Sequence, residues 1–149
     1  MRINTVTPAE KLGGNTPQNL INHSFHWLVP FGTYGAEHPE YYAFFDGKRD
    51  TETGGGGPQL CVTNKEVIKI ASETVINNLD QHPGLRNISV SQADTARYCH
   101  CDACEAINQA EGTPMGSQLT FVNAVADIVG QKHPNVKIGT LAYWYTRKA

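Results

Sequence analysis

KEVIKIASETVINNLDQHPGLRNISVS, residues 65–91, contains one complete helix–turn–strand unit. Apolar residues recur at helical spacing over residues 65–81, with polar residues on the opposite side, which predicts an amphipathic helix. The apolar positions of this helix are Val67, Ile70, Ala71, Val75 and Leu79. His82-Pro83-Gly84 ends the helix, because the residue before a proline disfavours helical geometry and glycine terminates helices readily. The apolar run over 85–91 then predicts a strand.

The same order of elements occurs a second time along the chain. Residues 117–132 predict another amphipathic helix, His133-Pro134-Asn135 ends it, and residues 136–145 predict a strand. The predicted buried stripe of this helix consists of Leu119, Val122, Ala126 and Val129. Upstream, residues 19–29 and 59–62 predict two further strands. Helices that alternate with strands indicate βαβ units, an α/β fold class and a parallel sheet.

Length and composition favour a single globular domain over residues 1–149, of which 40% are hydrophobic. We expect residues 1–20 to form an N-terminal segment and residues 31–58 to form an insertion. An eight-stranded (β/α)8 TIM barrel typically needs about 250 residues. The chain is therefore either a compact open α/β domain or part of a barrel.

Charge and hydropathy argue against two classes of partner. The formal net charge is −2 and no basic block is present, so we expect no nucleic-acid partner. No apolar run approaches the roughly 20 residues needed to span a membrane, so we expect no membrane partner. Residues 1–18 also lack the charged and then apolar layout of a signal peptide.

Polar and aromatic residues follow the predicted strands, where parallel α/β folds place their functional groups. The candidates for substrate binding are His23, His26, Asn64, Gln92, Tyr143 and Trp144. Amides and imidazoles can bond to sugar hydroxyl groups, and aromatic faces can cover the C–H faces of a sugar. The alternative for the aromatic residues is ordinary packing within a strand. Strand alternation would place Trp144 on the face opposite its two neighbours.

Asp94 is the candidate catalytic residue. A carboxylate just beyond an apolar strand is costly to bury unless it is paired or takes part in chemistry. The alternative is a helix cap or a turn residue, since aspartate commonly occupies both positions. Spacing alone leaves the two interpretations open.

The four cysteines, Cys61, Cys99, Cys101 and Cys104, have three interpretations. They form a structural zinc site, with Cys61 or His100 as the fourth ligand, or a disulfide of a secreted protein, or free thiols in the core. The sequence around Cys101 and Cys104 lacks a thioredoxin-like context, which argues against a redox active site. We favour a structural role, metal or disulfide, that holds the loop carrying Asp94.

Six stretches of the chain, in their order, resemble the bacterial family known as domain of unknown function 4838. They are HSFHWLVP (23–30), EHPEYYAFFDGKR (37–49), QLCVTNKEV (59–67), SVSQADTARYCHCDAC (89–104), GSQLTFVNAVA (116–126) and TLAYWYT (140–146). The resemblance extends from about His23 to the end of the chain. Gln92, Asp94 and the cysteine array match the family, whereas Ala93 stands where the family more often has Asn.

This resemblance implies a TIM barrel of the glycoside-hydrolase type, similar to glycoside hydrolase family 163, which acts on N-acetylglucosaminyl linkages. We therefore expect a glycan substrate and a fragment of a glycoside hydrolase, with the remainder of the barrel in cis. The family's chains continue beyond 140–146 into a strand that ends in an acidic residue. The resemblance also implies a periplasmic or extracellular full-length protein. The alternatives are a non-catalytic carbohydrate-binding domain and a small metal- or thiol-stabilised domain.

Overall fold

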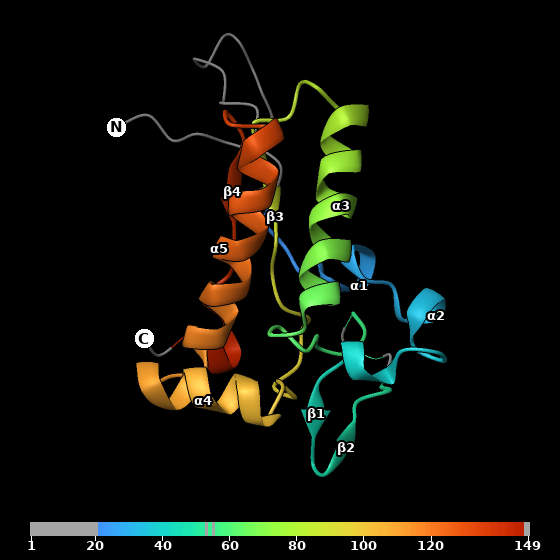
Figure 1. Cartoon of the computed structure of the whole chain (residues 1–149), viewed down its shortest axis with the longest axis vertical. Coiled ribbons are helices and arrows are strands. Elements are labelled where there is room, and N and C mark those ends of the chain that lie inside the picture. The colour runs from blue at the N-terminus through green and yellow to red at the C-terminus, as the bar shows by residue number, and fades with distance from the viewer. Residues whose placement is uncertain (1–20, 53, 55, 148–149) are drawn as a thin grey trace, which may run out of the picture.

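The computed structural model describes residues 21–52, 54 and 56–147. Two long helices, α3 (Lys65–Gln81) and α5 (Met115–Lys132), pack side by side on one face of a two-stranded sheet (Figure 1). The strands of this sheet are β3 (Asn87–Ser89) and β4 (Lys137–Gly139). The predicted N-terminal segment, residues 1–20, lies outside the described residues.

Strands β3 and β4 are parallel, and Ile88 is the register partner of Ile138. The chain crosses from one strand to the other through α4 (Asp102–Glu111) and α5, which makes a βαβ unit. The α/β class and the parallel pairing predicted from the sequence are confirmed. No closed barrel is formed by the described residues.

Helix α3 has the bounds that the sequence predicts, 65–81. The Oδ1 atom of Asn64 accepts hydrogen bonds from the main-chain N–H groups of Glu66 and Val67, at 2.9 and 3.4 Å, which caps the first turn. At its other end, the N–H of His82 donates to the carbonyls of Asn78 and Leu79. Four of the five predicted apolar positions are buried, and Ile70 is half-buried against the core.

Helix α5 is rotated relative to the stripe predicted for it. Val122 and Val129 are buried as predicted, whereas Leu119 is 40% exposed and Ala126 is half-buried, and Phe121 and Val125 are buried in addition. The ring of Phe121 packs edge-on against Phe25, with the ring centroids 5.6 Å apart. Because a buried aromatic ring removes more apolar surface from water than a leucine, Phe121 determines which face turns inward.

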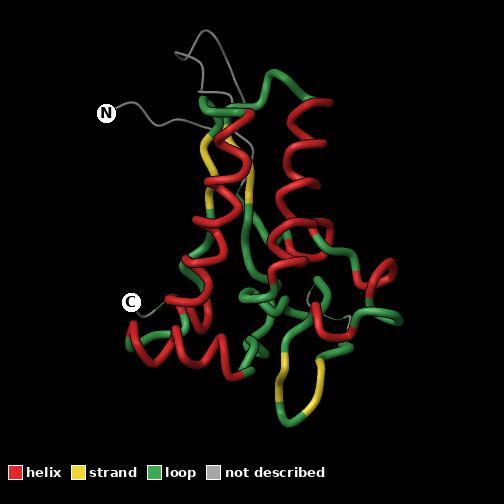
Figure 2. The backbone as a smooth tube through the Cα atoms, viewed as in Figure 1, coloured by secondary structure: helices red, strands yellow, loops and turns green. Residues whose placement is uncertain are grey.

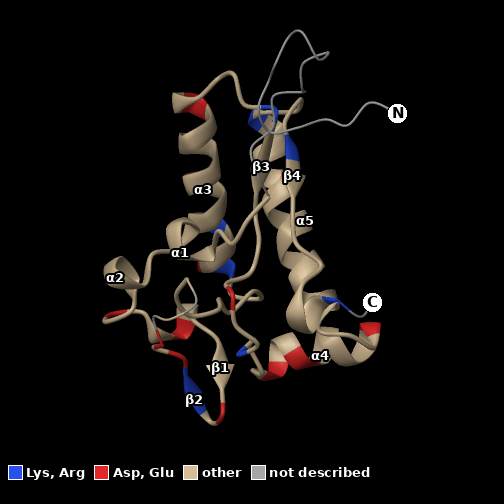
Figure 3. Cartoon of the chain, turned by 180° about the vertical axis from the view of Figure 1, so that it is seen from behind, with Lys and Arg blue, Asp and Glu red and all other residues tan. Residues whose placement is uncertain are grey.

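Helix α4 is an element that the sequence analysis missed, since it treated the cysteines as part of a loop. The helix begins directly after Cys101 and has acidic residues in its first turn, Asp102 and Glu105 (Figure 3). It ends at Gly112, whose φ of 72° is in the left-handed region. Acidic residues in a first turn and a glycine beyond the last turn are the signals that identify this helix in the sequence.

The first predicted strand, over 19–29, is wrong in its second half, where α1 (Phe25–Leu28) forms instead. The preceding residues do lie alongside β3 and its continuation. The N–H of Ser24 donates to the Ser91 carbonyl at 3.1 Å, and the N–H of Asn22 donates to Ser89 Oγ at 3.1 Å. Serine hydroxyl groups therefore replace part of a regular main-chain ladder.

Two other predicted strands are shorter in the structure than in the prediction. Residues 59–62 contribute one antiparallel bridge, between Leu60 and Tyr42. Only Lys137–Gly139 of the predicted strand over 136–145 is a strand, and Trp144–Thr146 forms a short 3-10 helix, η3. In both segments, polar side chains form hydrogen bonds with main-chain groups that a neighbouring strand would otherwise bond, as described below.

The predicted insertion contains α2 (Phe31–Tyr34), the 3-10 helix η2 (Pro39–Tyr41) and a hairpin of β1 (Phe44–Phe45) and β2 (Lys48–Arg49) (Figure 2). The hairpin turn consists of Asp46 and Gly47, both with positive φ, which is the geometry that Asp-Gly favours. Among the described residues, no helix is both long and apolar enough to cross a membrane.

Candidate functional site: the Asp94 loop and the thiol cluster

Asp94 lies in the loop that follows β3, and its carboxylate is half-exposed. The indole Nε1 of Trp144 donates a hydrogen bond to Asp94 Oδ1 at 3.0 Å. His23 Nε2 lies 3.9 Å from the same oxygen. Three of the residues predicted at separate strand ends therefore meet at one point.

Two aromatic side chains project beside Asp94 at the surface. Tyr143 is 42% exposed and Trp144 is 53% exposed, and their rings lie edge to face with centroids 6.1 Å apart. The φ of Trp144 is 53°, in the left-handed region. A bulky residue there costs about 1–3 kcal/mol and persists only where its surroundings fix it.

Gln92 fixes the turn that carries Trp144. Its buried Nε2 lies 3.1 Å from the carbonyls of Leu141 and Tyr143 and 2.8 Å from Thr146 Oγ1. The hydroxyl of Thr146 in turn accepts a hydrogen bond from the Tyr143 N–H at 3.0 Å. The sequence predicts Gln92 as a substrate ligand, whereas the structure places its side chain in the interior, behind the turn.

His26 and Asn64 lie apart from the contacts made by Asp94. His26 is exposed on α1, and Asn64 caps α3 while its Nδ2 donates to the Glu40 carbonyl at 3.5 Å. No hydrogen bond or ion pair among the described residues joins either side chain to Asp94. Their predicted role in substrate binding stays a prediction.

Gln59 supports the Asp94 loop from inside and was missed in the sequence analysis. Its buried Nε2 donates to the carbonyls of Ala93 and Thr95 at 2.9 and 2.6 Å, and its Oε1 accepts from the Ala93 N–H at 3.0 Å. These bonds bracket Asp94 on both sides. A single glutamine at the start of an apolar run gives no sequence signal for this role.

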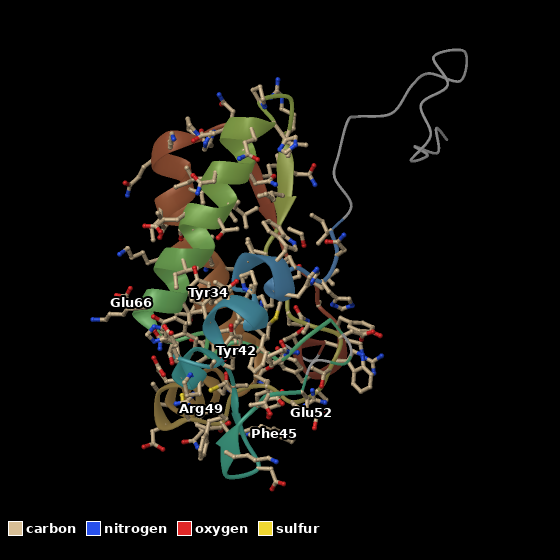
Figure 4. All side chains as sticks on the ribbon, turned by 90° about the vertical axis from the view of Figure 1, so that its right-hand side faces the viewer. Tyr34, Tyr42, Phe45, Arg49, Glu52 and Glu66 are labelled. Carbon is tan, nitrogen blue, oxygen red and sulfur yellow. The ribbon has the colours of Figure 1, made fainter. Side chains whose placement is uncertain are left out.

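An ion pair between the half-buried Arg97 and the buried Asp50 holds the next part of the loop. Arg97 Nε donates to Asp50 Oδ2 at 3.0 Å, and Asp50 Oδ1 accepts from the N–H of Glu52, a residue labelled in Figure 4. The Asp50 carboxylate is almost fully buried. The pair ties the loop after Asp94 to the segment that follows the β-hairpin.

The four cysteines converge on one small volume. Their sulfur atoms all lie within 4.8 Å of one another, and Cys61 Sγ is 3.7 Å from Cys101 Sγ. All four are free thiols, so no disulfide is formed. One cysteine precedes α3, and the other three flank the start of α4. The residues that the sequence analysis grouped as metal or disulfide ligands are thus brought together, at a spacing compatible with a metal ion.

Hydrogen-bond donors surround these sulfur atoms. The N–H of Phe44 donates to Cys99 Sγ at 3.3 Å, and Thr63 Oγ1 lies 3.3 Å from Cys104 Sγ. Hydrogen bonds from Cys104 and then Cys99 hold the pKa of the Cys61 thiol well below its usual range, and Arg49 lowers it further. The cluster therefore favours at least one thiolate.

An aromatic stack connects the cysteine segment to the Trp144 turn. The ring of Tyr98, next to Cys99, stacks on Tyr145, next to Trp144, with centroids 4.6 Å apart and planes at 21°. Burial first, and then the nearby Tyr98, raises the pKa of Tyr145. The two groups of candidate residues are consequently parts of one packed region.

The comparisons with known proteins give one result. A family model described as "Domain of unknown function (DUF4838)" matches residues 1–149. No curated protein matches the chain, and no solved structure matches it.

Proposed function

We propose that this chain, which belongs to the DUF4838 family, binds a glycan at the loop end of β3. The observation that carries the proposal is the exposed Trp144, held at a φ of 53° with its indole N–H bonded to Asp94. Backbone strain of this kind concentrates at binding and catalytic sites. A structural role for Trp144 would favour burial of its ring, and half of the side chain is exposed.

The chemistry of the group suits a sugar. Asp94 Oδ2 is left to accept a hydrogen bond from a hydroxyl group, since the contacts of Asp94 with Trp144 and His23 both involve Oδ1. His23 offers a further polar atom beside it. The faces of Tyr143 and Trp144 provide apolar area for the C–H groups of a pyranose ring.

Hydrolysis is the second part of the proposal. A glycoside hydrolase needs a second carboxylate about 5–10 Å from the first, and Asp94 would act as one of the pair. We propose that the chain is part of a (β/α)8 barrel whose remainder supplies that partner, with N-acetylglucosaminyl linkages as substrates and a periplasmic or extracellular location. The alternative is a non-catalytic domain that binds the glycan through the same residues.

Glycan-array binding by purified protein tests the site, with Asp94→Asn and Trp144→Ala as variants. Each variant should lose at least about tenfold in affinity, because a good charged hydrogen bond or an aromatic contact contributes about 1.5 kcal/mol. Asp127→Asn, an exposed carboxylate change on α5, is the matched control and should bind as the parent does. Unchanged binding by both site variants, or no glycan bound by the parent, would reject the proposal.

We propose, as a separate function of the cysteines, that they hold a structural zinc ion. Four thiolates at about 2.3 Å from zinc lie about 3.8 Å apart in a tetrahedron. The 3.7 Å between the sulfurs of Cys61 and Cys101 meets this value, and the widest separations, within 4.8 Å, require a contraction of about 1 Å. Four protein ligands leave no open position, so the ion would be structural and not catalytic.

Charge balance supports the same assignment. A divalent ion with four thiolates has a net charge of −2, and hydrogen bonds to the sulfur atoms offset it. The Phe44 N–H and the Thr63 hydroxyl are placed to donate, and Arg49, labelled in Figure 4, adds a positive charge beside Cys61.

Metal analysis of the purified chain tests the zinc proposal. The expected result is one equivalent of zinc, displaced by Cd²⁺ with the appearance of a thiolate-to-cadmium absorption band. Cys101→Ser should bind the ion more weakly. Asp127→Asn, at an exposed position of α5, is the control and should leave the zinc stoichiometry unchanged. A parent protein without metal that also gains no Cd²⁺ band, or one with a disulfide between these cysteines, would reject the proposal.

A further inference from the structure

We propose a second binding site, for a neutral monosaccharide ring, on the outer surface between α1 and α3. An open cavity of about 240 Å³ lies there, and it is independent of the group around Asp94. Its lining consists of Trp27, Thr74, Asn77, Asn78 and Gln81. One indole and four uncharged polar side chains therefore form the whole wall.

The fold builds this wall from one helix face and one neighbouring side chain. Positions 74, 77, 78 and 81 follow helical spacing, so they share one face of α3. The Thr74 hydroxyl bonds to the carbonyls of Leu28 and Ile70, at 3.1 and 2.8 Å, which joins α1 to this face. Trp27, on α1, is half-buried against the core and so has a fixed position beside the amides. Figure 1 shows α1 next to α3.

The three amide side chains are available to a ligand. Asn77, Asn78 and Gln81 make no side-chain hydrogen bond with any other residue that the structure describes. Each amide provides two donors and one acceptor, which matches the hydroxyl groups of a sugar. The face of the Trp27 indole provides the apolar surface for sugar C–H groups.

The lining contains no charged side chain, and this decides the class of ligand. Phosphate and carboxylate groups would find no cation in the wall to compensate for their lost hydration. A larger cavity, of about 310 Å³, differs in this respect, because it contains Asp80, Lys132 and His133. There Lys132 Nζ lies 2.6 Å from Asp80, and Arg86, also in the lining, donates to the carbonyls of Pro83 and Leu85.

The size of the cavity limits the ligand to about one ring. Pockets for drug-sized ligands begin at about 300 Å³, and this cavity is smaller and open to solvent. We therefore expect a single pyranose, bound at millimolar concentration, or one terminal residue of a longer glycan.

The two tryptophans of the chain allow each candidate site to be followed separately. In Trp144→Phe, Trp27 is the remaining indole, and its fluorescence is titrated with glucose, galactose, mannose and N-acetylglucosamine. At least one sugar should give a saturable change. The double variant Asn77→Ala, Gln81→Ala in the same background should weaken that binding at least fivefold. Asn123→Ala, an exposed asparagine on α5, is the matched control and should leave it unchanged.

Two results would overturn the second site. One is the absence of a saturable change with all four sugars, and the other is a change that persists undiminished in the double variant. The reciprocal variant, Trp27→Phe, reports on Trp144 in the same titrations. A failure at Trp27 with a response at Trp144 rejects only the second site, and the reverse outcome rejects only the site at Asp94.

Discussion

Two regions of this molecule are held together by different kinds of interaction. The helical layer consists of α3, α5, β3 and β4, and buried aliphatic and aromatic side chains fill the space between its helices and its sheet. The loop region consists of residues 40–52, 56–63 and 93–104, where side chains bond to loop carbonyls and sulfur atoms cluster. The first region depends on apolar burial and main-chain hydrogen bonds. The second also buries apolar residues, among them Tyr42, Ala43 and Leu60, and adds a few specific polar contacts and the sulfur cluster.

The difference has a consequence for stability. Apolar burial in the helical layer is spread over many residues, so a single change removes only part of it. The loop region relies in addition on a few polar contacts that join segments far apart in the sequence, such as Gln59 to Ala93 and Arg97 to Asp50. We therefore expect single changes in the loop region to affect whole segments.

The largest expected effect comes from removing two sulfur ligands together, in Cys61→Ser with Cys101→Ser. We expect a loss of about 5 kcal/mol or more, because structural zinc contributes about 10–16 kcal/mol of apparent binding free energy in small zinc domains. Urea unfolding followed by circular dichroism measures the change. The chelator EDTA should destabilise the parent and leave the variant unaffected. A variant as stable as the parent would show that the sulfur atoms only fill space.

The next largest effect concerns the helical layer. Phe121→Ala should destabilise the protein by about 3–5 kcal/mol, since it empties a site in the core beside Phe25. Leu119→Ala is the matched control on the same helix, and it should cost much less because Leu119 is 40% exposed. Equal losses in the two variants would contradict the observed rotation of α5.

How much of each region could be predicted follows from the same contrast. Periodicity predicted α3 with its bounds, because its cap, its apolar stripe and its stop signal are all local. It placed Leu119 in the core of α5, because spacing cannot show that Phe121 has an aromatic partner 96 positions earlier in the chain. The three-cysteine array was correctly singled out as one group with Cys61.

The Asp94 group was predicted only in part. Strand-end reasoning selected His23, Asp94 and Trp144, and the structure brings them together. It also selected Gln92 as a ligand, whereas this side chain is buried and bonds to the turn. Whether a polar residue points outward or supports the main chain depends on distant carbonyl groups that leave no mark in the local sequence.

Gln92→Ala tests this supporting role and ranks third in expected effect. It should cost about 1–3 kcal/mol, because Leu141, Tyr143 and Thr146 lose the three hydrogen bonds that the buried Gln92 amide makes to them. In a Trp27→Phe background the fluorescence of Trp144 should also shift, since its turn is no longer fixed. A loss of stability without any change at Trp144 would separate Gln92 from the positioning of that side chain.

Asn64→Ala should have the smallest effect, about 1 kcal/mol, through the loss of the cap on α3. Thermal unfolding measures it, and Asn64→Asp should retain most of the stability because aspartate also caps helices well. An equal loss in the two variants would indicate that Asn64 acts through its amide donor to Glu40 instead.

The most direct test of whether a metal ion at the cysteines holds the loop region is amide hydrogen exchange of the parent protein with and without a zinc chelator. We expect chelation to remove protection from residues 40–52, 56–63 and 93–104, including the loop that carries Asp94, while α3 and α5 remain protected. Identical exchange in the two conditions would contradict it, because the sulfur cluster would then have no part in holding the loop region.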